Sequence, residues 1–265
     1  MKNDEAIAPI IAVMLILAVV VTLLSVYNAT YLPGLKQSAE VQHLHEVEEG
    51  VLKFGSALEE AASLKRNISL SQQIPLGGGD ILFNSLKSGG SLRVQQESEP
   101  YLTISNYTAE AYNLTLINFS YWTVNNFWVD QGYTWQYGYV NVSRNAGSGG
   151  GTPLQYATMG DLSNDIVSFG KSLIYEIETN EDGSNITIEA VNFYTDENSF
   201  TSGNGYGKLK LNATRNKVFF DSDYSHVKLS VHDTVFSDCL QNYADREYPN
   251  KNVTLILTNI TVSAY

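Results

Sequence analysis

The sequence lacks residues on which several classes of protein depend. Cys239 is the only cysteine among 265 residues, so neither an intrachain disulfide nor a multi-cysteine zinc site can form. Basic residues are few: 16 lysines and arginines against 28 acidic residues give a net charge of −12, which argues against a nucleic-acid partner. Charged residues make up only 17% of the chain, whereas hydroxyl and amide side chains are abundant. We therefore expect a protein that functions outside the cytosol and depends on packing or on neighbouring subunits for its stability.

Catalytic motifs are also missing. The sequence has no phosphate-binding glycine loop followed by Lys-Ser/Thr, no Gly-x-Ser-x-Gly elbow and no His-Glu-x-x-His helix. No motif supplies a histidine partner to Cys239, which we interpret as a buried inert thiol rather than a nucleophile. The sequence thus predicts no enzyme activity, no catalytic residue and no cofactor. A membrane-tethered enzyme is a less favoured class.

Acidic and histidine side chains gather in three places without matching a metal motif. His45 and Glu49 have the i,i+4 spacing of two ligands on one helix face, with His43 nearby. A strong zinc motif has two histidines at that spacing, so we interpret this segment as a solvated charged face. Asp221-Ser222-Asp223 and Glu181-Asp182 do not match the twelve-residue calcium loop, and we interpret them as turn acids. The sequence predicts no metal site.

What the sequence does have is a long apolar segment near its start. No charged residue occurs between Ala6 and Leu35, and the segment from Ile7 to Val26 is apolar almost throughout. Its length matches the ~20 residues that a helix needs to cross a bilayer core. The segment lacks the basic start and the small-x-small site of a cleaved secretory signal. It therefore predicts a membrane-competent helix.

The helical pattern continues beyond Tyr31-Leu32-Pro33-Gly34, where proline removes a backbone donor and predicts a kink. Glutamates from Glu40 to Glu60 occupy one side of this second stretch, and Lys65-Arg66 end it. Residues 7–66 are thus predicted to form a kinked rod of about 90 Å at ~1.5 Å per residue. The apolar stripe that would face a globular domain recurs every three or four residues: Val41, Leu44, Val47, Val51, Phe54, Leu58 and Ala61.

The start of the apolar run resembles a known family. Asp4-Glu5-Ala6 precedes Ile7-Ala8-Pro9-Ile10-Ile11-Ala12-Val13-Met14-Leu15, which is similar to the start of mature euryarchaeal type IV pilins. Residues 26–35 also resemble a group of pilin-like archaeal surface proteins. The resemblance covers residues 4–66 and implies that a prepilin peptidase cleaves between Ala6 and Ile7, leaving the apolar helix on the protein.

The remaining sequence predicts an α+β fold with a mostly antiparallel β head. Residues 1–6 are the predicted leader, 7–66 the helix with 7–26 as its membrane or filament-core part, 67–80 a linker, and 81–265 an extracellular head. The head is expected to be a sandwich or a sheet wrapped on the helix. Predicted strands, separated by turn signals such as Ser202-Gly203-Asn204-Gly205, cover residues 91–95, 101–104, 114–117, 137–142, 173–177, 185–191, 208–211, 227–231 and 253–257.

The most distinctive part of the head is an aromatic cluster. All three tryptophans, Trp122, Trp128 and Trp135, lie within residues 121–139 together with several tyrosines. Aromatic residues that alternate in a hairpin stack across strands, so we expect this cluster to fill a core. The alternative is an adhesive surface that binds sugars or an adjoining subunit.

Asn-x-Ser/Thr triplets are frequent. Covalent N-glycans at such sites would shield an exposed head and favour an exterior location, whereas an Asn-rich and Thr-rich composition also produces triplets by chance. The candidate sites are Asn28, Asn67, Asn106, Asn113, Asn118, Asn141, Asn185, Asn212, Asn252 and Asn259.

These observations lead us to expect a structural subunit of a type IV pilus-like extracellular filament. Its expected partners are the membrane before assembly, copies of itself afterwards, and the pilus assembly machinery. The alternative is a single-span, glycosylated surface protein or adhesin that does not polymerise. Pro9 is expected to start the helix. The residues expected to carry assembly are Ile7, Ile10, Ile11, Val13, Leu15, Leu17, Val20 and Leu24.

Overall fold

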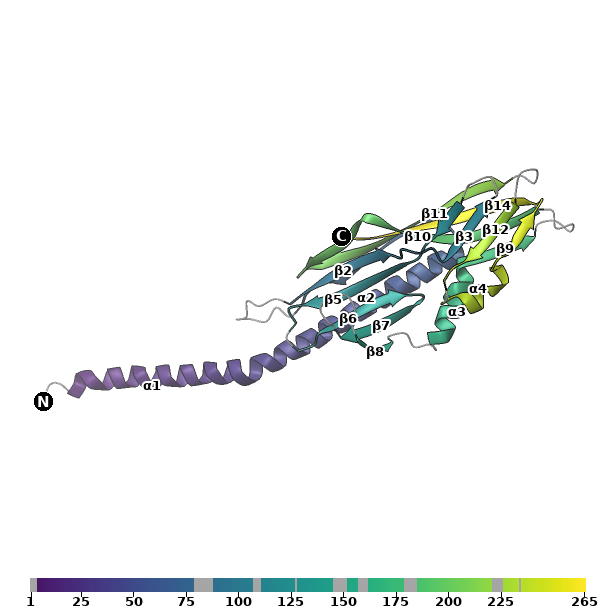
Figure 1. Ribbon diagram of the computed structural model, residues 1–265. Coiled ribbons are helices and arrows are strands. Elements are labelled where there is room, and N and C mark those ends of the chain that lie inside the picture. Colours follow the sequence, from purple (N-terminus) through teal and green to yellow (C-terminus); the bar gives the residue numbers. More distant parts are fainter. Residues whose placement is uncertain are drawn as a thin grey trace.

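The protein consists of a long N-terminal helical rod and a β-rich head, as the computed structural model shows (Figure 1). This arrangement confirms the predicted α+β class. The structure describes residues 4–78, 88–106, 111–126, 128–144, 152–156, 162–178, 185–220, 226–233 and 235–265.

The rod is one continuous helix with a widened turn in its middle. Helix α1 (Asp4–Val26) leads into a π-helical turn, η1 (Tyr27–Tyr31), and then into α2 (Leu32–Leu64). The N–H of Leu32 donates to the carbonyl of Tyr27, five residues earlier. Pro33 follows directly and has no N–H to donate, and a π-turn is one way in which a helix accommodates such a break. The rod bends at this junction (Figure 1), close to the predicted kink.

The strands of the head form two sheets within the described residues. The larger has the order β1-β11-β14-β10-β2-β5-β6-β7-β8, with β9 paired to β10, and the smaller has the order β13-β12-β3-β4. Neighbouring strands are antiparallel except for β10 and β14, which are parallel. The strands are β1 (Ile68–Pro75), β2 (Gly89–Gln96), β3 (Leu102–Asn106), β4 (Ala111–Leu114), β5 (Ile117–Val124), β6 (Gln131–Gln136), β7 (Tyr139–Arg144), β8 (Thr152–Tyr156), β9 (Ile174–Glu178), β10 (Asn185–Gly203), β11 (Tyr206–Phe220), β12 (His226–Val231), β13 (Glu247–Pro249) and β14 (Asn252–Ala264).

Two sequence predictions about these elements were wrong. The range 67–80, predicted as a linker, contains β1, which pairs with β11 from Ile68 opposite Ala213 to Pro75 opposite Tyr206. Its serines and glutamines are largely exposed, so its polarity reflects a solvated edge strand rather than a linker. The range 114–117, predicted as a strand, is a corner between β4 and β5, which belong to different sheets.

Helices cover part of the head. Helix α3 (Leu162–Leu173), which the sequence analysis missed, buries Phe169 and Leu173. Two further short elements, α4 (Ser237–Leu240) and the 3₁₀ turn η2 (Gln241–Tyr243), lie between β12 and β13.

The large sheet curls around α2, as one of the two predicted arrangements proposed. Strand β1 contacts α2 from one side, and β6 and β7 contact it from the other. Figure 1 shows α2 lying along the sheet while α1 projects beyond it. Six of the seven residues predicted for the apolar stripe are buried; Val41 is the exception, with 53% of its surface exposed.

The long strands β10 and β14 belong to two cores. Ile188 is paired with Leu255, whereas Phe193 is paired with Ile260, five residues further along each strand. Residues an odd number of positions apart point to opposite faces of a sheet, and all four are buried. The sheet is therefore covered on one face near Ile188 and Leu255 and on the other face near Phe193 and Ile260.

The face that carries Phe193 packs toward α2 and α3, since its ring contacts Phe169. The opposite face packs against the small sheet, where Tyr112 of β4 contacts Phe220 of β11 at 6.1 Å between ring centroids. The small sheet thus covers the second core, at the end of the head away from α1 (Figure 1).

A chain of aromatic rings fixes α2 in the sheet. Phe54 contacts Phe119 at 5.2 Å between ring centroids, Phe119 stacks on Trp135 at 5.5 Å, and Trp135 meets the edge of Phe169 at 5.5 Å. Tyr121 and Tyr133 are also buried, so the prediction that the aromatic cluster fills a core is confirmed for these residues. Trp128, by contrast, is 44% exposed.

Two glycines of α2 predict opposite effects of the same substitution. A Cβ at Gly55 would lie 2.6 Å from Cδ1 of the buried Trp135 ring, whereas a Cβ at Gly34 would meet nothing within 4 Å. We expect Gly55→Ala to lower the free energy of unfolding by about 1–3 kcal/mol through overpacking. Gly34→Ala should raise it by about 0.5–1 kcal/mol, because alanine is the better helix former. Denaturant unfolding followed by tryptophan fluorescence checks both, and equal effects of the two variants would contradict the packing described.

Candidate assembly helix and its attachment to the head

Helix α1 is apolar on every side and uncovered by the head. The consecutive residues Leu15, Ile16 and Leu17 are 62%, 64% and 61% exposed, although they point in different directions around the helix. Soluble proteins do not leave a helix of this kind in water; it is found in a membrane or inside an assembly. The helix is long and apolar enough to span a membrane. The predicted assembly residues that lie on this surface are Ile10, Ile11, Val13, Leu15, Leu17, Val20 and Leu24.

The polar side chains near the end of α1 bond to the helix itself. The hydroxyls of Thr22, Ser25 and Thr30 donate to the carbonyls of Val19, Val21 and Val26 at 2.7–2.8 Å. The amide of Asn28 donates to the carbonyl of Leu24 at 2.9 Å. Donors that are satisfied in this way do not need water, so these residues are compatible with lipid or with a helix bundle.

The N-terminal part of α1 differs from the sequence prediction in one respect. Pro9 was expected to start the helix, but α1 begins at Asp4 and Pro9 lies inside it. Residues 4–6, which the prediction had assigned to a leader, are part of this helix. The backbone of Ala6 and Ile7, the predicted cleavage pair, is helical, and their side chains lie outside the described part of the structure.

Glu40 ties the start of α2 to the head. Its carboxylate is buried, with 7% of the residue exposed, and Oε2 accepts hydrogen bonds from the backbone N–H groups of Trp128 (2.8 Å) and Val129 (3.1 Å). Two N–H donors to one carboxylate make a strong, charge-assisted contact. The loop between β5 and β6 is therefore held against the rod close to the point where the rod leaves the head.

Other polar contacts repeat this attachment along α2. The hydroxyl of Tyr133 donates to the carbonyl of Leu44 at 3.2 Å, and Nε2 of His43 lies 3.0 Å from the carbonyl of Pro75. The predicted solvated face was therefore wrong for His43 and Glu40, which the β5–β6 loop, β1 and Tyr121 cover. His45 and the adjacent Glu46 are exposed, as that interpretation expected.

The C-terminal end of α2 is fixed by Lys65. This residue has the left-handed backbone (φ 44°) that usually favours glycine at a helix end, and its Nζ donates to the carbonyl of Ser172 in α3 at 2.7 Å. Burial lowers the pKa of the Lys65 ammonium. Six residues earlier, burial raises the pKa of the Glu59 carboxyl, whereas the hydrogen bond that Trp135 donates to it lowers that pKa. Both ends of α2 are thus anchored, and the direction of α1 follows from them.

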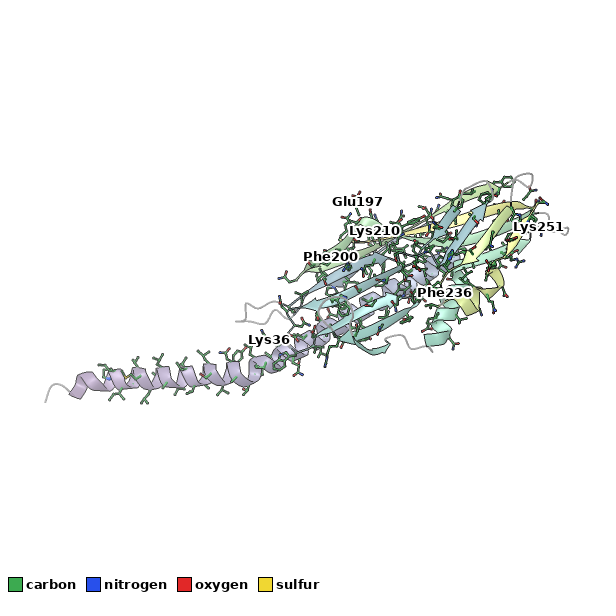
Figure 2. All side chains as sticks on the ribbon, viewed as in Figure 1. Lys36, Glu197, Phe200, Lys210, Phe236 and Lys251 are labelled. Carbon is green, nitrogen blue, oxygen red and sulfur yellow. The ribbon has the colours of Figure 1, made fainter. Side chains whose placement is uncertain are left out.

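The side chains on the rod change abruptly where it enters the head. Lys36 lies at this boundary (Figure 2) and is the first charged residue after Glu5. Beyond it the exposed stripe of α2 is charged, with an ion pair between Lys53 and Glu49 at 2.6 Å. The water-exposed part of the rod therefore begins at about Lys36.

The candidate glycosylation sites differ in accessibility. Asn67, Asn113 and Asn212 are exposed on the head, and Asn28 is exposed on the rod. Asn106, Asn118, Asn185 and Asn252 are half-buried, and the amide of Asn252 donates to Asn185 at 2.9 Å. Asn141 and Asn259 are half-buried with a buried side-chain oxygen that has no hydrogen-bond partner in the described part of the chain.

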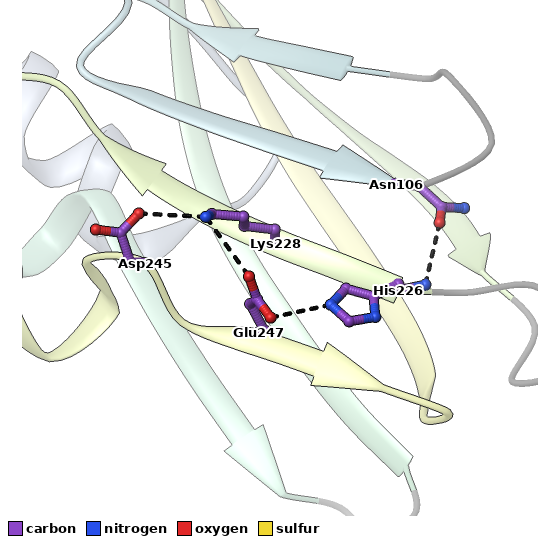
Figure 3. A network of polar contacts seen from close by, with 5 residues as sticks. All are labelled: Asn106, His226, Lys228, Asp245 and Glu247. Carbon is purple, nitrogen blue, oxygen red and sulfur yellow. Dashed lines mark hydrogen bonds and ion pairs between the residues drawn. The ribbon is translucent and has the colours of Figure 1, made fainter.

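Polar clusters at the end of the head away from the rod are ion-pair networks. Figure 3 shows Glu247 between His226 and Lys228, with Nε2 of His226 at 3.1 Å and Nζ of Lys228 at 3.5 Å. The hydrogen bond from His226 lowers the pKa of Glu247, and Lys228 acts in the same direction. Asp245 also pairs with Lys228, and Asn106 accepts the backbone N–H of His226. Exposed pairs of this kind contribute little to stability.

No metal or nucleophile site emerges from the described residues. No three histidine, cysteine or acidic side chains among them are placed to hold a metal ion. The thiol of Cys239 is half-buried and donates to the carbonyl of Phe236 at 3.2 Å. The predicted turn acids at 181–182 and 221–223 lie outside the described residues.

Comparison of the chain with protein-family models, with curated proteins and with solved structures found no match.

The Glu40 contact predicts a specific loss of stability. Glu40→Ala removes the acceptor of two backbone N–H groups, and we expect the free energy of unfolding to fall by about 1–3 kcal/mol. Glu46→Ala, an exposed position of the same helix, is the matched control and should change it by less than about 0.5 kcal/mol. Thermal unfolding followed by circular dichroism measures both; equal losses would show that Glu40 does not hold the loop.

Proposed function

We propose that this protein is a structural subunit of a type IV pilus-like extracellular filament and that it assembles through α1. The observation that carries the proposal is a helix that is apolar on every side and is continuous with a helix embedded in a folded head. Such a helix is stable in lipid and equally stable among copies of itself, so it can move from membrane to filament without exposure to water.

The attachment of α2 supports this role. Glu40 and Lys65 fix the two ends of α2, so a force on the head is transmitted along the rod. The side chains of Thr22, Ser25, Asn28 and Thr30 bond to the helix backbone and leave the apolar surface free to pack. A subunit of a filament needs both properties.

The position of Pro9 supports removal of residues 1–6. In the intact helix the missing N–H of Pro9 falls inside α1, where a hydrogen bond is lost. After cleavage before Ile7, Pro9 would be the third residue and would lie in the first turn, where the N–H has no acceptor in any case. Cleavage thus converts an unfavourable proline into a favourable one.

Two measurements on native material test the proposal. Electron microscopy should show surface filaments that contain this chain, and mass spectrometry should find an N-terminus at Ile7. Retained Met1 together with dispersed single particles would favour the alternative, a membrane-anchored surface protein that does not polymerise.

A charge in α1 should separate folding from assembly. We expect Val13→Asp to abolish filaments and to reduce membrane retention at least about tenfold, because an unpaired carboxylate would enter a dry environment. The head should unfold at an unchanged temperature, since Val13 is 65% exposed and touches none of it. Val41→Asp is the matched control, because Val41 is exposed on the charged stripe of α2. Normal filaments from Val13→Asp would contradict the model.

Accessibility predicts which asparagines carry glycans if the head is exposed to a glycosylation system. Asn67, Asn113 and Asn212 should be modified, whereas Asn141 and Asn259, with their buried oxygens, should not. Glycopeptide mass spectrometry of native protein measures the occupancy at each site. Modification of Asn141 or Asn259 with Asn67, Asn113 and Asn212 bare would be inconsistent with the described surface.

A further inference from the structure

A hollow lined by uncharged residues lies on the outer face of the large sheet. It has a volume of about 490 Å³ and lies where β10, β2 and β5 run side by side. This volume is within the range of ~300–1,000 Å³ found for small-molecule sites. It lies on the face of the sheet opposite α2, because Leu92 and Tyr121, which alternate with its lining residues, point inward and are buried.

The strand register explains why the sheet is hollow at this point. Ser202 of β10 is paired with Ser91 of β2, and Gly89 of β2 is paired with Val124 of β5. At Gly89 and Ser91 the central strand therefore carries only small side chains on this face, and Arg93, which is paired with Phe200, is the next residue of β2 to point there. Larger side chains stand on either side, with Phe200 on β10 and Val124 on β5. Small residues between two taller rows leave a depression.

The lining has hydrogen-bonding groups but no charge. Ser91, Ser202, Asn125 and Asn204 contribute hydroxyls and amides, and no charged side chain is among the described residues that line the hollow. None of these four side chains makes a hydrogen bond to another described residue. Four uncommitted donor and acceptor groups in a lining without charge match the hydroxyls of a neutral polyol, and they do not match a lipid tail.

Phe200 supplies the apolar part of the site. Its side chain is 58% exposed, and no aromatic ring of the described residues contacts it. An exposed ring beside hydroxyl and amide groups is the arrangement that binds the C–H face of a pyranose while the polar groups bond its hydroxyls. Figure 2 shows Phe200 on the half of the head nearer the rod.

Gly89 keeps the floor of the hollow low. A Cβ added at Gly89 would lie 2.8 Å from the carbonyl oxygen of Gly203, so the close approach of β2 and β10 requires glycine at this position. Gly89 shares the outer face with Ser91, and neither residue carries a side chain large enough to fill the space between β10 and β5.

We propose that this hollow binds the neutral pyranose ring of a carbohydrate, with Phe200 stacked on the ring and Ser91, Ser202, Asn125 and Asn204 bonded to its hydroxyls. The ring belongs either to a glycan in solution or on another molecule, or to the headgroup of a neutral glycolipid near the rod. The site does not depend on filament formation, because a monomeric membrane protein would have the same hollow.

Saturation-transfer NMR on the full chain tests the proposal. The protein is held in a zwitterionic phosphocholine detergent, since a sugar-based detergent would occupy the site. The probes are the methyl pyranosides of glucose, galactose, mannose and N-acetylglucosamine. We expect at least one to receive saturation on its ring C–H protons. Absence of transfer to every one of them would overturn the proposal.

Two variants and a control locate the site. Phe200→Ala should weaken binding about tenfold through loss of the stacked ring, and Ser202→Leu, at an exposed position, should abolish it by filling the hollow. Phe219→Ala removes an equally exposed ring (61%) on another face and should leave binding unchanged. Equal binding by Phe200→Ala and the unmodified chain, with folding verified by thermal unfolding, would overturn the proposal.

Reconstitution then distinguishes the two sources of the sugar. The chain is placed in phosphatidylcholine vesicles with or without glucosyl-diacylglycerol, and the bound methyl glycoside is measured. Loss of its signal only in the glycolipid vesicles would assign the headgroup as the occupant, because it already fills the hollow. An equal signal in both would assign a glycan outside the membrane.

Discussion

The burial of one face of α2 in the curved sheet is the contact on which the rest of the molecule depends. Because α1, η1 and α2 are one helix, the contacts that hold α2 also decide where α1 points. The Phe54–Phe119–Trp135 stack holds its middle, and Glu40 and Lys65 hold its ends. The rod of residues 4–64 measures about 90 Å at ~1.5 Å per residue, so a small change at α2 would displace the tip of α1 considerably.

The π-turn at η1 separates two incompatible environments within this single helix. On one side, moving α1 out of water is favourable by about 25 cal/mol per Å² of apolar surface buried. The described part of the head does not cover this surface. On the other side, α2 keeps a charged stripe in water. Pro33 lies just after the turn, and Asn28 and Thr30 within it bond to the preceding turn. The bend therefore falls where the requirement for lipid or helix neighbours ends and the requirement for water begins.

The sequence predicts those features that depend on local periodicity and misses those that depend on distant partners. The stripe from Leu44 to Ala61 was predictable because each apolar residue returns to one helix face. Burial of Glu40 was not, since its partners, the N–H groups of Trp128 and Val129, lie almost 90 residues away. Likewise β1 is polar on its own and becomes a strand only beside β11, and the hollow needs three strands in register. In the head, the aromatic cluster was predictable as core because alternation in a hairpin is local.

The same composition explains both the soluble surface of the head and its candidate sugar site. A chain with 17% charged residues keeps its outer sheet faces in water through hydroxyls and amides, which are also the groups that bond to sugars. Composition alone therefore cannot distinguish a site from a surface. Phe219 is as exposed as Phe200, but Phe219 is paired with Thr254 and is not among the residues that line the hollow, whereas Phe200 is. A ring beside a hollow can stack on a ligand that the hollow also surrounds, whereas a ring without one can offer only a single contact. The depression over Gly89 and Ser91 is what distinguishes Phe200 from Phe219.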